Sequence, residues 1–362
     1  MTIRRIAWLP IFSSVCIAMS NAPLAAQRGS PGSRALITRR FVADSFWTRA
    51  WYRGASKDPD LFTEPREVIV AGDLVVVLDM GLREISAFDV RTGATRLQLA
   101  ARGEGPGEFK RPAHLVAVHD GFAVLDHVTS RLSAFDTHGR FTWDTPITNA
   151  GGAEGICVRR DGRVVAKMPG AQDAIVTFDS TGRTILRQSM PWPDGGIRTA
   201  GLSAFMAGPD ANGNCVLARR FGSEWLVVGS SGTLARRSYV SRHPEAVVDV
   251  KTGPKKRIGR EGTFTRTEFT SNDAGTSGVM TIGDTAIVRG GPAERDGYRV
   301  LDYHLLPSGR YLHSRRLPTV FIATAVGADG TFFGTTIGEE SGALIAFRAT
   351  AVKPPPRQPG GN

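Results

Sequence analysis

The sequence predicts an all-β fold, a six-bladed β-propeller of four-stranded antiparallel blades whose ring is closed by an N-terminal strand. Two observations predict this fold. A glycine-containing turn between two apolar runs occurs six times along the 362 residues, and a second strand–turn–strand element follows most of its copies. Internal repeats with a period of about 40 to 50 residues are typical of propellers.

The first repeated element is a turn that contains Asp-Gly, Gly-Asp or Asn-Gly, with an apolar β-rich run on each side of it. Its six copies are VIVAGDLVVVLD, LVAVHDGFAVLD, ICVRRDGRVVAK, AGPDANGNCVLAR, VMTIGDTAIVRG and TAVGADGTFFGTT. These dipeptides supply the positive φ angles that tight hairpins require. Each copy therefore predicts a β-hairpin.

The second element has alternating apolar residues before a turn, as in ISAFDVRTG, LSAFDTHGR and IVTFDSTGR. This alternation predicts a further strand, turn and strand, which together with the hairpin make a four-stranded unit. Such a unit has apolar residues on both faces and cannot bury them alone. Neighbouring units must therefore stack, and six units stacked radially make a ring.

The last copy, from about Val320 to Thr350, has room for only three strands. Upstream of the first copy, the segment ALITRRFVADSF (Ala35 to Phe46) has the composition of a spare strand. We expect this segment to complete the last blade and to close the ring by joining the two ends of the chain.

The ends of the chain predict segments outside the ring. Residues 1–26 have the features of a secretory signal: Arg4 and Arg5, an apolar stretch, and Leu24-Ala25-Ala26 as a cleavage site. The further expected segments are a linker at 27–34, the propeller at 35–351 and a disordered Pro- and Gly-rich tail at 352–362. The mature chain is expected to be periplasmic or extracellular, without a transmembrane anchor, because later apolar stretches are too short to span a bilayer.

Two cysteines, Cys157 and Cys215, follow the signal segment. An oxidising exported compartment would allow them to pair. Two separate buried thiols explain the sequence equally well, and the spacing matches no metal motif. The sequence leaves the pairing open.

The segment GEGPGEFKRPAHLVAVHDGFAVLDHVTSRLSAFDTHG, from Gly103 to Gly139, resembles the NHL repeat and the wider group of exported bacterial six-bladed propeller proteins. The residues that carry the resemblance include Gly103, Gly105, Gly107, Phe109, Pro112, Asp126 and Arg131. The resemblance implies the fold over most of the chain. It implies function weakly, because such propellers serve as binding platforms and occasionally as enzymes.

We expect these residues to be structural. The glycines of the approach loop, before Pro112, permit a tight backbone path between blades, and Phe109 would fill the gap between two sheets. Asp126 and Arg131 are five residues apart across a hairpin and are expected to pair.

No clear catalytic motif is found in the sequence. The residues around Glu104 look superficially like the metal-binding start of gluconolactonase-type propellers, but the other inner strands begin with Arg66-Glu67, Glu154, Ser203, Ser277 and Thr324. A hard divalent cation needs several converging oxygen ligands, and zinc needs three or four donors, so no metal or other cofactor is expected. Only His114, of seven histidines, lies where an inner strand begins. His114 and Arg66 are therefore candidate ligand contacts near the central channel.

One interval between repeats is too long by about twenty residues, which predicts an insertion at about 233–278, between the fourth and fifth blades. It contains VKTGPKKRIGR, a run of positive charge in a chain of formal net charge +11. The basic residues are Lys251, Lys255, Lys256, Arg257 and Arg260. Such a loop would suit an anionic partner, although a solvated loop without a ligand explains the same charges.

The sequence favours a noncatalytic binding or scaffold propeller of the cell envelope or secreted space, which recognises a protein, or an anionic or carbohydrate polymer, on one face of the ring. Nucleic acid is not an expected partner of an exported protein. The alternative is a propeller hydrolase or lyase, lactonase-like, with its site in the central channel. An enzyme would bring at least three inner-strand carboxylates, amides or histidines together there, whereas a binder would present an exposed apolar or charged face.

Overall fold

The computed structural model describes residues 41–42, 47–54, 61–100, 103–147, 153, 155–168, 174–189, 204–219, 224–229, 231–232, 234–238, 248–258, 262–271, 276–290, 299–306, 308–337 and 342–349. The predicted signal segment 1–26, linker 27–34 and tail 352–362 lie outside these residues. Contacts divide the chain into two compact units, which are described separately. One includes Val247–Asn272, and the other comprises Arg34–Ala246 and Asp273–Asn362.

In the first unit the described residues form one antiparallel β-hairpin of β18 (Val248–Ile258) and β19 (Gly262–Ser271). Lys251 lies opposite Glu268, and Lys256 lies opposite Phe264. The sequence predicts a long loop here, and that prediction is wrong for these residues. The reason is the composition of β19, GTFTRTEFTS, because threonine and phenylalanine favour a pleated strand.

The second unit is all-β, and within the described residues it contains no α-helix and six antiparallel sheets of four strands each. The first three sheets are β2 (Pro65–Ala71), β3 (Leu74–Asp79), β4 (Glu84–Asp89), β5 (Thr95–Leu99); β6 (Pro112–Val118), β7 (Gly121–Asp126), β8 (Arg131–Asp136), β9 (Phe141–Pro146); and β10 (Gly155–Val158), β11 (Val164–Met168), β12 (Ala174–Phe178), β13 (Thr184–Ser189). The other three are β14 (Ala204–Ala207), β15 (Cys215–Arg219), β16 (Glu224–Val228), β17 (Leu234–Ser238); β20 (Thr276–Ile282), β21 (Thr285–Gly290), β22 (Val300–Leu305), β23 (Arg310–Arg316); and β24 (Thr324–Val326), β25 (Phe332–Ile337), β26 (Gly342–Ala349) with β1 (Trp47–Gly54).

The six hairpins predicted from the repeated glycine turns are confirmed. They are β2–β3, β6–β7, β10–β11, β14–β15, β20–β21 and β24–β25. At Gly72 and Gly330 the backbone φ is 60° and 80°, in the left-handed region that residues with a side chain rarely adopt. The turns therefore use glycine for a backbone reason.

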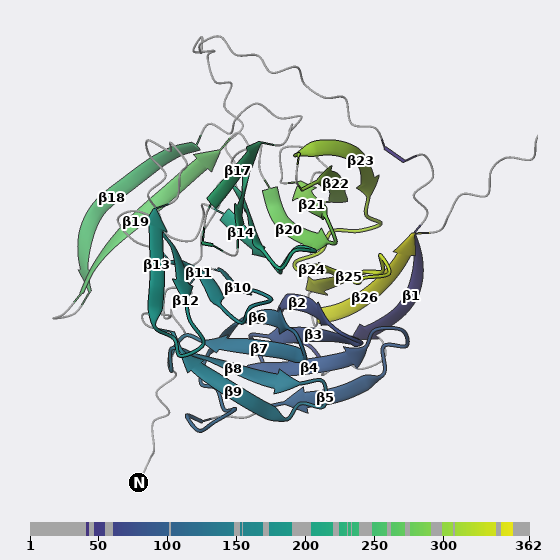
Figure 1. The fold of residues 1–362 in the computed structure, drawn as a ribbon, viewed down its shortest axis with the longest axis horizontal. Helices are drawn as coiled ribbons and strands as arrows, with labels where there is room; N and C mark the ends of the chain where they lie inside the picture. Colours follow the sequence, from purple (N-terminus) through teal and green to yellow (C-terminus); the bar gives the residue numbers. More distant parts are fainter. Residues whose placement is uncertain are drawn as a thin grey trace, which may run out of the picture. The chain divides into compact units, whose positions relative to one another are not determined.

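The sheets of this unit are arranged around a centre, with the inner strands β2, β6, β10, β14, β20 and β24 nearest to it (Figure 1). Each inner strand contacts the inner strands of the sheets before and after it. Among the described residues, six buried apolar clusters each span two neighbouring sheets. In one of them, Leu78 of β3 lies with Phe122 of β7. The predicted propeller-like ring of four-stranded blades is confirmed.

The strand that pairs with β26 is not the predicted one. The sequence predicts Ala35 to Phe46 for this place, but the pairing strand is β1, Trp47–Gly54. Ala35 to Arg40 lie outside the described residues, and Phe41 forms one isolated bridge with Ser314. The preference for β1 has a physical reason in its two tryptophans.

Trp47 and Trp51 pack on opposite faces of the last sheet. The Trp47 ring lies 5.8 Å from the Phe332 ring, and the Trp51 ring lies 5.7 Å from the Phe333 ring. Since adjacent residues of a strand point to opposite faces, Phe332 and Phe333 mark the two faces of β25. A register shift between Arg49 and Trp51 places one tryptophan on each face. Each indole N–H also donates to a backbone carbonyl, that of Arg316 (2.6 Å) or Val90 (3.1 Å).

The predicted insertion between the fourth and fifth blades is narrower than 233–278. Its first residues form β17, the outer strand of the fourth sheet, and its last residues form the start of β20. None of the described residues form a helix with the length and hydropathy that a membrane span requires.

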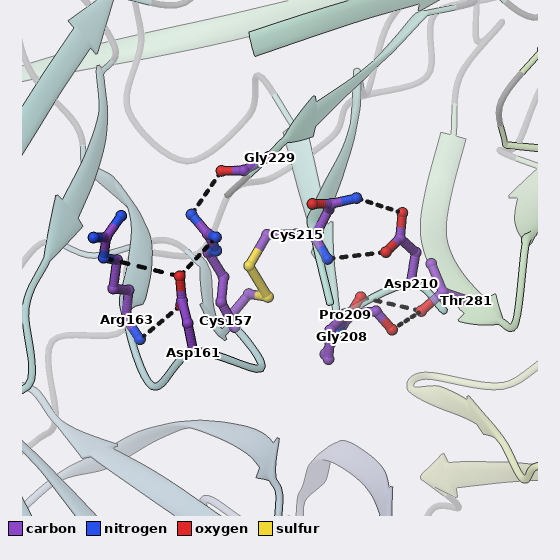
Figure 2. The surroundings of a disulfide bond; sticks show 11 residues. Cys157, Asp161, Arg163, Gly208, Pro209, Asp210, Cys215, Gly229 and Thr281 are labelled. Atoms are coloured by element: carbon purple, nitrogen blue, oxygen red, sulfur yellow. Dashed lines mark hydrogen bonds and ion pairs between the residues drawn. A yellow bond between two sulfur atoms is a disulfide. The ribbon is translucent and has the colours of Figure 1, made fainter. Parts of the chain in front are cut away.

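A disulfide bond links the third and fourth sheets. Cys157 of β10 and Cys215 of β15 are 58 residues apart in sequence, and their Cα atoms are 6.0 Å apart (Figure 2). The bond lies in a buried cluster with residues such as Val165 and Leu226. Beside it, the buried Arg159 donates to the carbonyl oxygen of Gly229 (2.6 Å). The pairing that the sequence left open is therefore present.

Replacing both cysteines, Cys157→Ser with Cys215→Ser, is expected to lower the free energy of unfolding by about 2–4 kcal/mol. The bond restricts the unfolded chain by closing a loop of 58 residues, and the loss of that restriction favours unfolding. Urea unfolding without reductant measures the difference, and reduced wild-type protein should match the variant. Intact mass of the native protein showing two free thiols would contradict the bridge.

Candidate functional site

A cavity of about 270 Å³ lies where the inner strands begin. The first residues of β2, β6, β10, β20 and β24 line it, so it occupies the mouth of the central channel at that end of the blades. Both residues that the sequence placed at the channel, Arg66 and His114, line this cavity. Glu67 and Arg289 line it too and were not among the predicted site residues.

Glu67 and His114 join the first and second sheets inside this cavity. One oxygen of the Glu67 carboxylate lies 2.6 Å from His114 Nδ1, and the other accepts the backbone N–H of Leu115 at 2.6 Å. His114 Nε2 lies 3.0 Å from the carbonyl oxygen of Ala153, just before the third sheet. Both neighbours of the imidazole are acceptors, so both hydrogen bonds form only when both ring nitrogens carry hydrogen. In that state the ring is a cation held between three blades.

A second histidine shares the same acceptor. His127 Nε2 lies 3.1 Å from the Ala153 carbonyl oxygen, and the two imidazole rings are 5.4 Å apart. Burial lowers the pKa of His127 below its ordinary value, and positive charge on His114 lowers it further. His127 is therefore a neutral hydrogen-bond donor around pH 7.

The two arginines of the cavity differ in exposure. The Arg66 side chain is 46% exposed and forms an ion pair with Glu64. Arg289 is buried and donates to the carbonyl oxygens of Phe321 (2.9 Å) and Ile322 (3.2 Å), which hold the loop before β24. Arg66 is thus the cation that a ligand can reach.

This arrangement suits binding of an acidic group more than proton transfer. Arg66 and Arg289 outnumber the single carboxylate of Glu67 in the cavity lining. Both ring nitrogens of His114 lie against acceptors of the protein itself, the Glu67 carboxylate and the Ala153 carbonyl, and not against open space for a substrate. Within the described part of the chain, no group of three or more His, Cys, Asp or Glu side chains is placed to hold a metal ion.

Exposed apolar side chains surround this end of the blades. Met80 follows β3 and its N–H donates to the Glu64 carbonyl, next to the start of β2. Val128 follows β7 in the corresponding turn of the second sheet, and Val320 and Ile322 precede β24. Their exposed fractions are 38%, 57%, 48% and 39%. We call these four side chains the apolar rim; of the four, Ile322 also lines the cavity itself.

The approach loop of the second blade is held by its own residues. The Gly105 N–H donates to Glu108 Oε2 (2.8 Å), and a Cβ added at Gly103 would clash with the same oxygen. Gly107 has φ of 75°, which favours glycine. Phe109 is 3% exposed and lies in the buried cluster between the first and second sheets, 5.9 Å from the Phe135 ring.

Asp126 connects this loop to the hairpin. Its buried carboxylate accepts backbone N–H groups of Lys110 and Arg111 on the loop, at 2.6 and 2.5 Å, and of Val128 and Thr129 after β7, both at 2.8 Å. Burial raises the pKa of Asp126, but these hydrogen bonds outweigh it and hold the pKa below its ordinary value. Pro112, which starts β6, lies opposite Asp126 in the sheet.

The expected pair between Asp126 and Arg131 is wrong for the described residues, although the two are cross-strand neighbours. The four N–H donors already occupy the carboxylate. The Arg131 guanidinium instead lies 3.3 Å from Asp144 and donates to the Glu104 carbonyl oxygen at 3.2 Å. Glu104 itself forms an ion pair with Lys110 of the same loop.

The basic residues of the predicted insertion are on the β18–β19 hairpin. Lys251, Lys255, Lys256 and Arg257 belong to β18, and Arg260 lies outside the described residues. The structure pairs Lys255 with Thr265 and Arg257 with Thr263 across the hairpin. These residues belong to the smaller unit, whereas Arg66 and His114 belong to the other.

The Asp126→Asn variant is expected to lose about 3 kcal/mol of unfolding free energy at pH 7, because an amide cannot accept four N–H groups. The folded-state pKa is lowered, so the carboxylate stabilises the fold above the unfolded pKa of about 3.9, and the effect is lost as pH falls through the folded value. The difference in unfolding free energy between variant and wild type should therefore become smaller towards pH 3. Urea unfolding across this pH range measures it. Asp120→Asn, at an exposed turn, is the control, and an equal loss there would contradict the argument.

Comparison of the sequence with protein-family models and with curated proteins gives no match. Solved structures are similar in fold. A putative exported protein from Bacteroides fragilis has a TM-score of 0.52 at 12% identity, over 85% of this chain and 97% of that one. A DUF4221 family member from Bacteroides vulgatus has 0.50 at 8% identity (84% and 98%), and virginiamycin B lyase from Staphylococcus aureus has 0.50 at 8% (83% and 99%). These similarities support the propeller fold alone.

Proposed function

We propose that this protein is a noncatalytic binding propeller of the cell envelope or secreted space that holds a protein partner against the end of the blades where the inner strands begin. The observation that carries the proposal is the cavity of Arg66, Glu67 and His114 with its apolar rim. Binding sites for proteins combine exposed apolar side chains with an arginine at the centre. An acidic side chain of the partner would enter the cavity, and the apolar rim would pack around it.

The proposal includes a closed ring of six blades, related to the NHL-like exported propellers that the segment from Gly103 to Gly139 resembles. Six four-stranded sheets and six buried clusters between neighbouring sheets support the ring, and the pairing of β1 with β26 supports closure by an N-terminal strand. A rigid ring is a suitable platform because it holds the loops of one face in fixed positions.

The exported location has three supports. The start of the sequence has the composition of a secretory signal. The Cys157–Cys215 bridge persists in oxidising compartments such as the periplasm or extracellular space. The putative exported protein from Bacteroides fragilis shares the fold.

The competing function is a lyase or hydrolase with its site in the channel. It is supported by the carboxylate and imidazole placed together in the cavity, and one protein of similar fold is named a lyase. The acceptors on both nitrogens of His114 favour the binding function instead. The two differ in outcome, because an enzyme would release an altered product and a binder would retain its partner.

Photo-crosslinking tests the binding face. A benzophenone amino acid at Val128 or Val320 should give one specific adduct with a protein from the compartment of the native cell. The purified partner should then bind wild-type protein at least tenfold more tightly than the Arg66→Ala variant, since central arginines often dominate interfaces. The control position is Ile185, which is 40% exposed on the outer strand β13. Equal adducts from Ile185, or unchanged affinity of Arg66→Ala, would reject this face.

We also infer that the basic residues of β18, together with Arg260, contact an anionic polymer. Heparin is the probe, and changing Lys251, Lys255, Lys256, Arg257 and Arg260 to Gln should move elution from a heparin column to clearly lower salt. The matched control changes five exposed basic residues of other strands and loops: Arg91, Arg96, Lys110, Arg140 and Arg183. An equal shift in both variants would mean that net charge alone, and not the hairpin, holds the polymer.

A further inference from the structure

A second cavity lies at the opposite end of the last two sheets. Its volume is about 370 Å³, and its lining includes Ile282, the last residue of β20, and Val326, the last residue of β24. The channel cavity is lined by the first residues of these same strands. We name this second space the interblade cavity and define it by Tyr303, His313, Arg315, Asp329, Thr331 and Arg348.

One wall of the interblade cavity is a stack of flat groups. The Tyr303 ring stacks on the His313 ring, with centroids 4.4 Å apart and planes 17° apart. The Arg315 guanidinium lies 5.8 Å from the Tyr303 ring and 5.9 Å from the Trp47 ring. Cation–π contact with two rings fixes the position of this guanidinium. Trp47 belongs to β1 and contacts Arg315 from outside the lining, so the pairing of β1 with β26 supports this wall.

The two arginines of the interblade cavity, Arg315 and Arg348, make few close contacts with acceptors among the described residues. Within the described residues, no carboxylate lies at ion-pair distance from Arg315 or Arg348, and the buried Nε of Arg315 has no hydrogen-bond partner. Arg348 Nε donates only to Thr331 Oγ1, at a long 3.4 Å. An arginine with unused N–H groups in a cavity favours a bidentate acceptor such as a carboxylate.

The one acidic residue of the lining is already engaged. Asp329 accepts the Thr331 backbone N–H (2.9 Å) and hydroxyl (2.8 Å). Burial raises the pKa of Asp329, but these bonds and the charge of Arg348 outweigh it and keep the group ionised. Burial also raises the pKa of Tyr303, so its phenol stays neutral and can donate a hydrogen bond. The lining therefore offers two cations and a hydroxyl donor to a ligand.

We propose that the interblade cavity binds a small organic carboxylate that carries one ring. The carboxylate would lie between Arg315 and Arg348, and the ring would pack along the Tyr303 and His313 wall. The volume is in the lower range of small-molecule sites, which suits a ligand of one ring. This site does not depend on the binding face proposed at the other end of the blades.

The probes are benzoate and glucuronate, each compared with its neutral counterpart, benzyl alcohol and glucose, by calorimetry at constant ionic strength. At least one acid should bind at millimolar concentration or below, and its neutral counterpart should not. Inorganic phosphate and acetate are anions without a ring, so they test the contribution of charge alone. Both should bind more weakly than the ring-containing acid. Failure of both acids to bind, or equal binding of phosphate or acetate, would overturn the proposal.

The variants Arg315→Gln and Arg348→Gln are each expected to weaken binding of the acid at least tenfold, and Tyr303→Phe to weaken it several-fold. Arg348 is exposed, so its change tests the site even if Arg315→Gln perturbs the packing of Trp47. Arg140→Gln, an equal change of charge on the exposed turn after β8, is the control. The proposal would also be overturned if Arg140→Gln lost as much affinity for the acid, or if a folded Arg348→Gln variant bound the acid as tightly as the wild type. The Arg66→Ala variant should bind the acid normally, which separates this site from the binding face.

Discussion

The structure depends on one constraint: every sheet of the larger unit is apolar on both faces. A strand such as β3 is buried along its whole length, so neither face of its sheet can meet water. Each sheet must therefore be covered twice, and a ring is the arrangement in which every sheet covers the next. The six buried clusters between neighbouring sheets are the result. The hydrophobic effect thus stabilises the interfaces between blades more than any single blade.

The last sheet satisfies this constraint with residues from both ends of the chain. β1 contributes a tryptophan to each face because its register shifts between Arg49 and Trp51. Trp47 joins the cluster facing the fifth sheet, and Trp51 joins the cluster facing the first. A straight strand would place residues four apart on the same face. The bulge is therefore what lets one short strand seal two interfaces.

The face that carries the candidate site is built by a repeated aspartate. Asp126 joins the approach loop of the second blade to the turn after β7, because it accepts backbone N–H groups from both, and Asp79 plays the same part in the first blade. Asp79 accepts the N–H groups of Thr63, Glu64 and Leu82 at 2.7 to 3.0 Å. These loops precede the inner strands, so the same contacts position Arg66, Glu67 and His114. Stability and ligand recognition are thus linked through the backbone of the approach loops.

Sequence periodicity was enough to predict the repeated hairpins, the four-stranded units and the location of Arg66 and His114 at the channel. These features depend on local turn chemistry and on alternation along one strand, which the sequence contains directly. The two cavity residues that the sequence did not predict, Glu67 and Arg289, are important because of contacts between distant segments. Glu67 matters because it reaches His114 on the next sheet, and Arg289 matters because it reaches the loop before β24. Neither contact has a signal at short range in the sequence.

The sequence by itself determined that the chain must stack repeated β-units, because its apolar residues alternate and its glycines recur at the turns. Only the tertiary structure decided which N-terminal strand completes the last sheet, that Cys157 pairs with Cys215, and that Asp126 binds backbone N–H groups instead of Arg131. The physical reason is the same in each case. Each of these contacts joins residues that are distant in sequence. Packing and hydrogen-bond geometry determine which partner is preferred, and both exist only after the sheets have assembled.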